Sequence, residues 1–195
     1  MPRTDTYRSF AELSASEPPS SFRIHRLERD RSVVILAPHG GGIERGTRRI
    51  SRAIAGHDWS WYCFEGRLEA GNRRLHITST NFDEAGALGL VERADVALAV
   101  HGAHEQDGSW TMVGGRVGAL ADDIGTALRI ARFELRACDA RRRAGDARNI
   151  CNRAARGAGV QLELSRALRD RLIGDAALRD RYVAAVRGAI AARRA

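Results

Sequence analysis

Apolar runs that suit strands alternate along the chain with segments in which apolar residues recur at helical spacing. The continuous apolar run from Ser32 to Ala37 indicates a central strand covered on both faces. Thr47 is predicted to cap a helix that carries Ile50 and Ile54. Further strands are predicted at 61–64, 75–78, 95–100, 110–113 and 160–164, and further helices at about 83–93 and 117–128, with two more divided at 174–175. The alternation predicts an α/β fold with a mixed, mostly parallel sheet flanked by helices.

The length and composition fit one globular domain. The chain has 195 residues, of which 44% are hydrophobic and 29% charged, a mix that excludes collagen-like, coiled-coil and wholly disordered chains. Residues 1–20 end in a Ser- and Pro-rich stretch and are predicted to be a leader segment without a strand or long helix of its own. Residues 21–195 are predicted to form a single α/β domain.

The apolar pattern also bears on location. No apolar run approaches the roughly 20 residues that a membrane helix needs, so a membrane partner is not expected. The first residues lack the apolar core of a secretory signal, which predicts that the chain is cytoplasmic at synthesis. The three cysteines have no C-x-x-C spacing, so neither a disulfide scaffold nor a zinc finger is expected.

Positive charge is concentrated in two segments. The formal net charge is +8, and all 32 basic residues are arginine. Residues 136–149 hold five Arg against two Asp, and residues 165–195 hold eight Arg against three Asp. This distribution favours an anionic partner, either an acidic polymer or nucleic acid, over a neutral one. Nucleic acid is the less favoured partner because no aromatic residues are interleaved with the arginines. The alternative is that these arginines lie on the solvent-exposed outer faces of helices and bind no partner.

Two predicted strands run into histidines, and one histidine is followed by glycines and a glutamate. His39 and His101 come directly after apolar strands, and side chains at the carboxyl ends of parallel strands share one edge of a sheet. The glycine run after His39 permits a tight turn that brings Glu44 back beside it. Two histidines and one glutamate suit a catalytic Zn²⁺ with an open fourth position. One alternative is that the histidines are core or loop residues whose nitrogens are hydrogen-bonded within the protein. Another is that the glycine turn binds a phosphate, although the lysine of a P-loop is missing.

A third strand carries a carboxylate. Alternation places Gln161 and Glu163 on the face opposite Val160, Leu162 and Leu164. An unpaired buried carboxylate is costly, so Glu163 either faces water or has a chemical role. Beside a zinc site, that role would be the general base.

Several motifs, taken in order, match one known family. They are Ala37–Glu44, Phe64–Gly66, Leu75–Glu84, Val100–Gly102, Gly114–Gly115, Asn149–Asn152 and Gly159–Ser165. Over residues 20–172 the chain resembles the phage-type poly-γ-glutamate hydrolases, some of which have been labelled phage-related replication proteins. The resemblance implies a zinc carboxypeptidase-like fold, a hydrolase domain, Zn²⁺ held by His39, Glu44 and His101, and Glu163 as the base. The spacing H-x₄-E departs from the H-x-x-E of carboxypeptidase A-type enzymes.

The resemblance implies hydrolysis of γ-glutamyl amide bonds in an acidic polymer or a peptide-like substrate. One alternative is that the enzyme hydrolyses another amide, such as an N-acyl amino acid or a peptidoglycan peptide. The other is that the protein is a nucleic-acid-binding replication accessory. A phage origin would allow release by lysis. Four polar residues are candidates for substrate contacts: His76, Asn81, Asn149 and Asn152. Hydrogen bonds in turns and helix caps are the other explanation for their presence in these motifs. The sequence leaves open the oligomeric state and which arginines bind substrate carboxylates.

Overall fold

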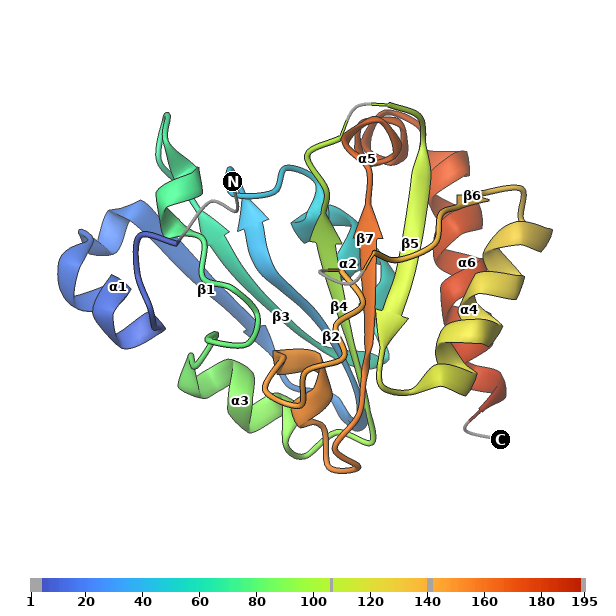
Figure 1. The fold of residues 1–195 in the computed structure, drawn as a ribbon, viewed down its shortest axis with the longest axis horizontal. Coiled ribbons are helices and arrows are strands. Elements are labelled where there is room, and N and C mark those ends of the chain that lie inside the picture. Colours follow the sequence, from blue (N-terminus) through green and yellow to red (C-terminus); the bar gives the residue numbers. More distant parts are fainter. Residues whose placement is uncertain (1–4, 106, 140–141, 194–195) are drawn as a thin grey trace.

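The computed structural model describes residues 5–105, 107–139 and 142–193. Within them, seven strands form one sheet in the order β1-β3-β2-β4-β7-β5-β6 (Figure 1). The strands are β1 Phe22–Leu27, β2 Asp30–Gly41, β3 Trp59–Gly66, β4 Val96–Gly102, β5 Trp110–Gly115, β6 Glu134–Leu135 and β7 Val160–Leu164. The pairs β2–β3, β2–β4, β4–β7 and β5–β6 are parallel, whereas β1–β3 and β5–β7 are antiparallel. The predicted mixed, mostly parallel sheet flanked by helices is therefore confirmed.

One face of the sheet, which we call the helix-covered face, packs against the longer helices. They are α2 Thr47–Ala55, α4 Gly118–Ile130, α5 Arg166–Gly174 and α6 Ala176–Ala192. Their apolar stripes meet the apolar side of the strands, where Ile54, Leu128 and Tyr182 are fully buried beside Leu162. All four helices are confirmed, but the predicted cap is wrong. Gly46 is the N-cap of α2 and Thr47 is its first helical residue.

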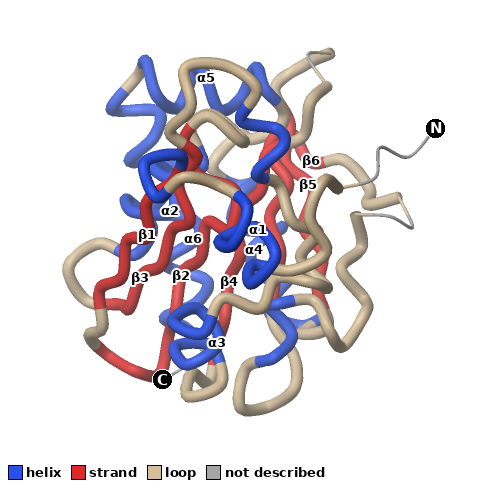
Figure 2. Tube along the Cα trace, turned by 90° about the vertical axis from the view of Figure 1, so that its left-hand side faces the viewer, coloured by secondary structure: helices blue, strands red, loops and turns tan. Residues whose placement is uncertain are grey.

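The other face, which we call the loop-covered face, carries short helices and long connections. The short helices are α1 Phe10–Ser16, α3 Ala85–Val91 and the 3₁₀ turns Pro19–Ser21, Asn72–Leu75 and Ile150–Arg153. They cover a second apolar cluster that includes Leu36, Phe64 and Phe82. In Figure 2 the loops, drawn in tan, occupy much of the right-hand side of the sheet.

Three differences from the sequence prediction concern this face and the sheet edges. Residues 75–78 are not a strand: a 3₁₀ turn ends at Leu75 and an irregular segment follows. β1 and β6 lie at the two edges of the sheet and were not predicted. β6 has two residues, too few for a periodic pattern.

Residues 5–17 pack against the loop-covered face. Leu13 of α1 is fully buried, and Phe10 makes edge-on contacts with Phe22 and Phe64. The segment has one short helix and no strand. The division of the chain into a leader and one domain stays a prediction. Among the described residues, no helix has both the length and the apolar character needed to cross a membrane.

Candidate metal centre and catalytic pocket

A pocket of about 310 Å³ opens on the loop-covered face at the carboxyl ends of β2, β4 and β7. The carboxyl edge of parallel strands is where α/β proteins place their sites. The lining residues are polar for the most part: His39, Glu44, His76, Thr78, Ser79, Thr80, His101, Ala144, Gly145, Asp146, Asn149, Gln161 and Glu163.

His39 reaches this pocket because β2 is irregular. From Ala37, β2 advances three residues to Gly40 while its partner β3 advances two, so β2 holds one extra residue. Strict alternation would place His39 with Ala37 on the helix-covered face. The bulge redirects it to the loop-covered face, where it stacks on His76 and lies edge-on to Phe82.

Glu44 and His101 arrive by simpler routes. Gly41 has φ 64°, and a Cβ there would lie 2.4 Å from the Gly66 carbonyl oxygen, so the turn requires glycine. The turn closes when the Glu44 N–H donates to the His39 carbonyl oxygen at 3.0 Å. His101 projects into the pocket by the ordinary alternation of β4.

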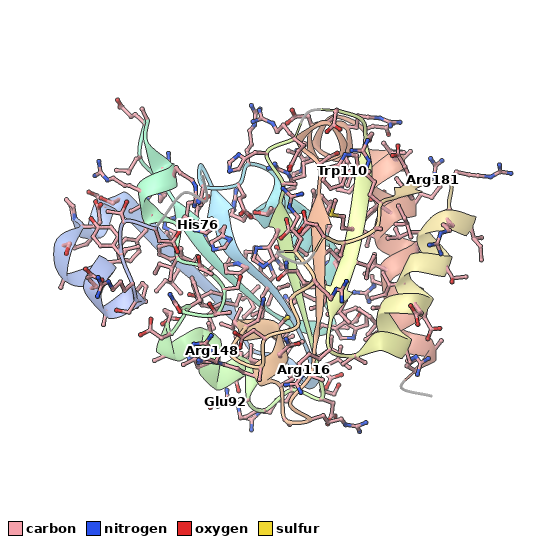
Figure 3. All side chains as sticks on the ribbon, viewed as in Figure 1. His76, Glu92, Trp110, Arg116, Arg148 and Arg181 are labelled. Atoms are coloured by element: carbon pink, nitrogen blue, oxygen red, sulfur yellow. The ribbon has the colours of Figure 1, made fainter. Side chains whose placement is uncertain are left out.

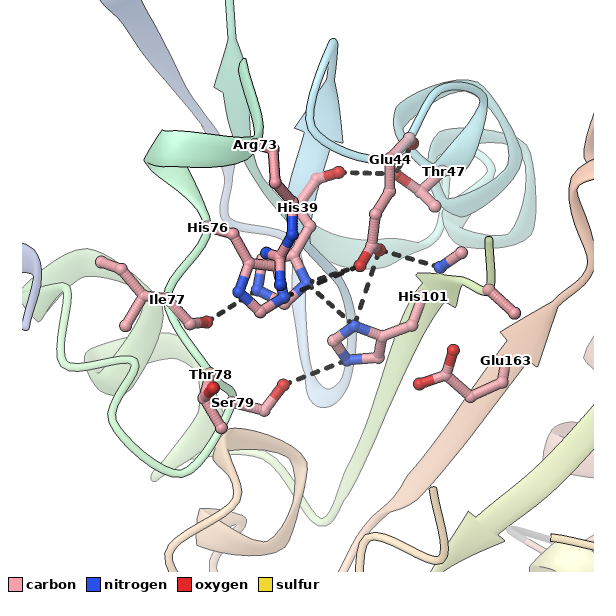
Figure 4. Close-up of polar contacts among 12 residues, drawn as sticks. His39, Glu44, Thr47, Arg73, His76, Ile77, Thr78, Ser79, His101 and Glu163 are labelled. Atoms are coloured by element: carbon pink, nitrogen blue, oxygen red, sulfur yellow. Dashed lines mark hydrogen bonds and ion pairs between the residues drawn. The ribbon is translucent and has the colours of Figure 1, made fainter. Parts of the chain in front are cut away.

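The three side chains converge on one point (Figure 4). His39 Nδ1 lies 3.1 Å from His101 Nδ1 and 3.1 Å from Glu44 Oε1, and His101 Nδ1 lies 3.8 Å from Glu44 Oε2. Two ligand atoms that share one tetrahedral Zn²⁺ lie about 3.4 Å apart. The separations of the three donors are therefore of the size that a shared zinc ion requires.

Hydrogen bonds on the far side of each ligand fix its orientation. His39 Nε2–H donates to the Ile77 carbonyl oxygen at 2.7 Å, which leaves Nδ1 facing the other ligands. His101 Nε2 lies 3.4 Å from Ser79 Oγ. Glu44 Oε2 accepts from the Gly102 N–H at 2.8 Å. Partners of this kind hold the ligands of metal centres in proteins, so the residues present fit a divalent ion.

The electrostatics of the cluster also suit a cation. Burial alone lowers the pKa of His39, but the charge and hydrogen bond of Glu44 outweigh it and raise that pKa. Burial lowers the pKa of His101 to about 3, which keeps its imidazole neutral and able to act as a ligand. The nearby histidines lower the pKa of Glu44 against its burial, so the carboxylate is ionised.

Glu163 stands beside this cluster. It is the register partner of His101 across the parallel pair β4–β7, and Figure 4 shows its carboxylate beside the His101 ring. Its Oε1 accepts from Gln161 Nε2 at 2.9 Å. Burial and the charge of Glu44 raise the pKa of Glu163, while Arg142 and Arg169 act in the opposite direction. A carboxyl group with a raised pKa next to a metal-type cluster is typical of an acid–base residue.

The sequence profile of the family described as poly-gamma-glutamate hydrolase matches residues 7–187 of the chain. This chain belongs to that family. The resemblance inferred from the linked motifs is thus confirmed. Among curated proteins, the SPbeta prophage-derived UPF0714 protein YoqZ of Bacillus subtilis (strain 168) is 42% identical over 163 residues, which cover 83% of this chain. The chain spans 59% of the length of YoqZ.

Two solved structures superpose closely on this chain. A bacteriophage poly-gamma-glutamate hydrolase gives a TM-score of 0.91 at 33% identity, over 98% of this chain and 99% of that chain. A zinc-free apo form of YndL gives a TM-score of 0.84 at 34% identity, over 96% of each chain. An N-acetylmuramoyl-L-alanine amidase from Clostridium difficile 630, at 13% identity and a TM-score of 0.51 over 82% of this chain and 95% of its own, shares the fold alone.

His76 lines the pocket, and its role as a substrate contact stays a prediction. Its ring stacks on His39 with centroids 4.0 Å apart, and its Nε2 lies 4.0 Å from Glu44 Oε1. Its Nδ1 lies 2.7 Å from Asp5 Oδ1. Burial and the His39 charge lower the pKa of His76 to about 4. Burial raises the pKa of Asp5, but hydrogen bonds from His76 and Thr78 outweigh it and hold that pKa well below its usual range.

The three asparagines predicted as substrate contacts lie in different places. Asn149 lines the pocket and donates to Gln161 Oε1 at 3.1 Å. Asn152 is buried behind the pocket wall, where it donates to the carbonyl oxygens of Ala144 and Asp146. Asn81 is exposed in a turn and does not line the pocket. Their roles in substrate binding stay predictions.

The basic segment 136–149 is largely ion-paired. Arg142 pairs with Glu105 and Asp139, and Arg148 pairs with Asp146. Arg141, which the sequence places in the same basic run, lies outside the described residues.

Three residues of the site escaped the sequence analysis. Asp5 lies far from His76 in the chain, and no local pattern links the two. Gln161 was placed on the face of Glu163, and that shared face was the one signal for its role. Arg169 is buried in α5, where it donates hydrogen bonds to three carbonyl oxygens, those of Arg45, Ala103 and Leu164. Its positive charge interacts with the carboxylates of Glu44 and Glu163. In an arginine-rich helix nothing distinguishes it from its neighbours.

Proposed function

We propose that this chain is a zinc-dependent hydrolase of γ-glutamyl amide bonds, with poly-γ-glutamate as its substrate. The observation that carries the proposal is the convergence of His39, Glu44 and His101 within 4.8 Å of one another, with Glu163 on the adjacent strand. Membership of the poly-gamma-glutamate hydrolase family supports the choice of substrate. The zinc-free apo structure of YndL supports the choice of metal.

His39, Glu44 and His101 would hold the ion through Nδ1, a carboxylate oxygen and Nδ1. Zn²⁺ bound there would act as a Lewis acid that polarises an amide carbonyl and lowers the pKa of a water molecule to about 7. The buried charge of Glu44 explains why a cation suits this place. A buried carboxylate is stable only when it is paired with positive charge.

Glu163 takes the proton from the attacking water and returns it to the leaving amine. Its position supports this role because the carboxylate faces the pocket while Gln161 holds one of its oxygens. With a raised pKa, Glu163 keeps an acquired proton long enough to deliver it. Positive charge on Arg142 and Arg169 favours the ionised form that begins the cycle.

An acidic substrate fits the charges around the pocket. Poly-γ-glutamate carries one free α-carboxylate per residue. The positive charge of Arg73 acts on His39 and His76, and that of Arg142 acts on Glu163, so guanidinium groups lie near pocket residues from two different strands. Charge complementarity of this kind speeds the encounter of a polyanion with the protein. Which arginine binds a substrate carboxylate is left to experiment.

Chain cleavage by the zinc-loaded protein tests the proposal. We expect the zinc-loaded protein to shorten poly-γ-glutamate, and size-exclusion chromatography measures the chain length. A chelator should stop the reaction. Glu163→Gln keeps the shape and the hydrogen bond but cannot accept a proton, so zinc content should be unchanged and kcat should fall about 10²- to 10⁴-fold.

Glu92→Gln is the matched control. Glu92 is exposed, and Figure 3 shows it at the lower edge of the molecule, away from His76. Its replacement should leave kcat unchanged. If Glu163→Gln retains native turnover, Glu163 has no part in the mechanism. If poly-γ-glutamate stays at full length while a small N-acyl amino acid or peptidoglycan peptide is cleaved, the substrate is another amide. Binding of nucleic acid without any cleavage would favour the replication-accessory alternative.

A further inference from the structure

The irregular segment 76–79 orients both histidine ligands. Ile77 supplies the carbonyl oxygen for His39 Nε2, and Ser79 supplies the hydroxyl near His101 Nε2. The segment belongs to no strand or helix, so no ladder of backbone hydrogen bonds holds it in place. Its position must therefore come from contacts with other parts of the chain.

Asp5 provides two of these contacts from the far end of the sequence. Its Oδ1 lies 2.7 Å from His76 Nδ1, and its Oδ2 accepts from the Thr78 N–H at 2.5 Å. Arg73 Nη1 lies 3.9 Å from Oδ1 and adds a longer ion pair. One carboxylate thus bridges a side chain and a backbone amide of the segment that orients the ligands.

These contacts decide the tautomer of His76. An ionised carboxylate is only an acceptor, so Nδ1 of His76 must carry the hydrogen that it donates to Asp5. In the neutral imidazole the other nitrogen, Nε2, then presents a lone pair. Nε2 lies on the pocket side of the ring, 4.0 Å from Glu44 Oε1, and the ring stacks on His39. Asp5 therefore aims an acceptor into the pocket.

We infer that Asp5 is a positioning residue that holds His76 in the Nδ1–H tautomer, so that His76 Nε2 accepts a hydrogen bond from an N–H of the amide substrate. The inference rests on the proposed function for the identity of the substrate. The positioning itself rests on contacts that exist without any substrate.

The tautomer is measured directly by ¹⁵N–¹H correlation spectra of the full chain labelled on histidine. The chain has six histidines, and the spectrum of His76→Phe identifies the signals of His76 by their loss. We expect His76 to be the Nδ1–H tautomer in the native chain, with and without zinc. Asp5→Ala removes the acceptor and should shift His76 toward the Nε2–H tautomer.

Kinetics provide the second measurement. His76→Phe keeps the ring that stacks on His39 but removes both nitrogens, so zinc content should be retained while kcat/KM on poly-γ-glutamate falls. Asp5→Ala should lower kcat/KM about 10- to 100-fold, the range found when an orienting partner is removed. If Asp5 acts through His76, the double variant Asp5→Ala/His76→Phe should be no slower than His76→Phe alone.

Asp83→Ala is the matched control. The Asp83 Oδ1 accepts from the Phe10 N–H at 2.5 Å, so it ties down the same N-terminal segment without touching His76. It should leave both the tautomer and kcat/KM unchanged. An equal loss in Asp83→Ala, or additive losses in the double variant, would show that residues 5–17 act only as packing. If the native chain cleaves no poly-γ-glutamate, the proposed function fails, while the spectra still decide whether Asp5 sets the tautomer. A His76 that keeps its tautomer in Asp5→Ala overturns the inference.

Discussion

The helix-covered and loop-covered faces of the sheet are built from different kinds of contact. On the first, apolar side chains of α2, α4, α5 and α6 meet apolar strand residues. On the second, buried polar groups such as His39, His101, Asn149 and Asn152 lie beside the apolar cluster. Each buried polar group needs a hydrogen-bond partner. Irregular segments have free backbone N–H and C=O groups to offer, whereas a regular helix uses these groups in its own hydrogen bonds. The candidate site therefore lies on the face where irregular segments can supply such partners.

The largest effect is expected from truncating the helix-covered face. Leu128 of α4 is fully buried, so Leu128→Ala should lower the free energy of unfolding by about 2–5 kcal/mol. Urea denaturation measures the loss, and the zinc content of the folded protein should not change. Ile130→Ala in the same helix is the control, because Ile130 is 76% exposed and its loss should cost less than about 0.5 kcal/mol. A changed zinc affinity in Leu128→Ala would contradict the separation of the two faces.

A polar truncation on the loop-covered face should affect stability and hydrolysis together. Asn152→Ala removes the donor to the carbonyl oxygens of Ala144 and Asp146 and the acceptor for the Gly159 N–H. The unpaired groups should cost about 1–3 kcal/mol of unfolding free energy. Ala144 and Asp146 line the pocket, so kcat/KM should fall as well. Glu92→Gln, at an exposed position outside the pocket, should change neither quantity. An Asn152→Ala protein with native kcat/KM would show that other contacts hold this wall.

The smallest expected effect concerns pH. Hydrogen bonds from Arg74 lower the pKa of Glu17 below its ordinary value of 4.5, and burial opposes them. A carboxyl whose pKa is depressed by folding adds stability that is complete above its unfolded pKa and disappears as the pH falls through its folded pKa. Glu17→Gln should therefore be less stable than the native chain at pH 7, and the difference should vanish in acid.

Unfolding free energies of both proteins, measured between pH 7 and 3, test this dependence. Glu12→Gln, within α1, is the control and should follow the native curve. A difference for Glu17→Gln that persists unchanged at pH 3 would mean that the Glu17 charge does not hold the N-terminal segment in place.

The two faces also differ in how well the sequence predicted them. The amphipathic helices follow a 3.6-residue period that reports one buried stripe, so α4, α5 and α6 were predicted. His39 and His101 were found because strand ends are recognisable, and Glu163 because of the cost of a carboxylate in an apolar strand. The strand predicted at 75–78 was wrong because its apolar residues pack on the sheet without joining it. The contact between Asp5 and His76 depends on tertiary folding and has no local signal.

The pairing of His101 with Glu163 has a consequence for how such a protein can diversify. The two residues face each other across adjacent parallel strands, whose separation of about 4.8 Å is set by backbone hydrogen bonds. No loop contributes to that separation. Insertions or substitutions in the connections around the pocket can therefore alter what enters it and how it lies, while the distance between His101 and Glu163 stays constant.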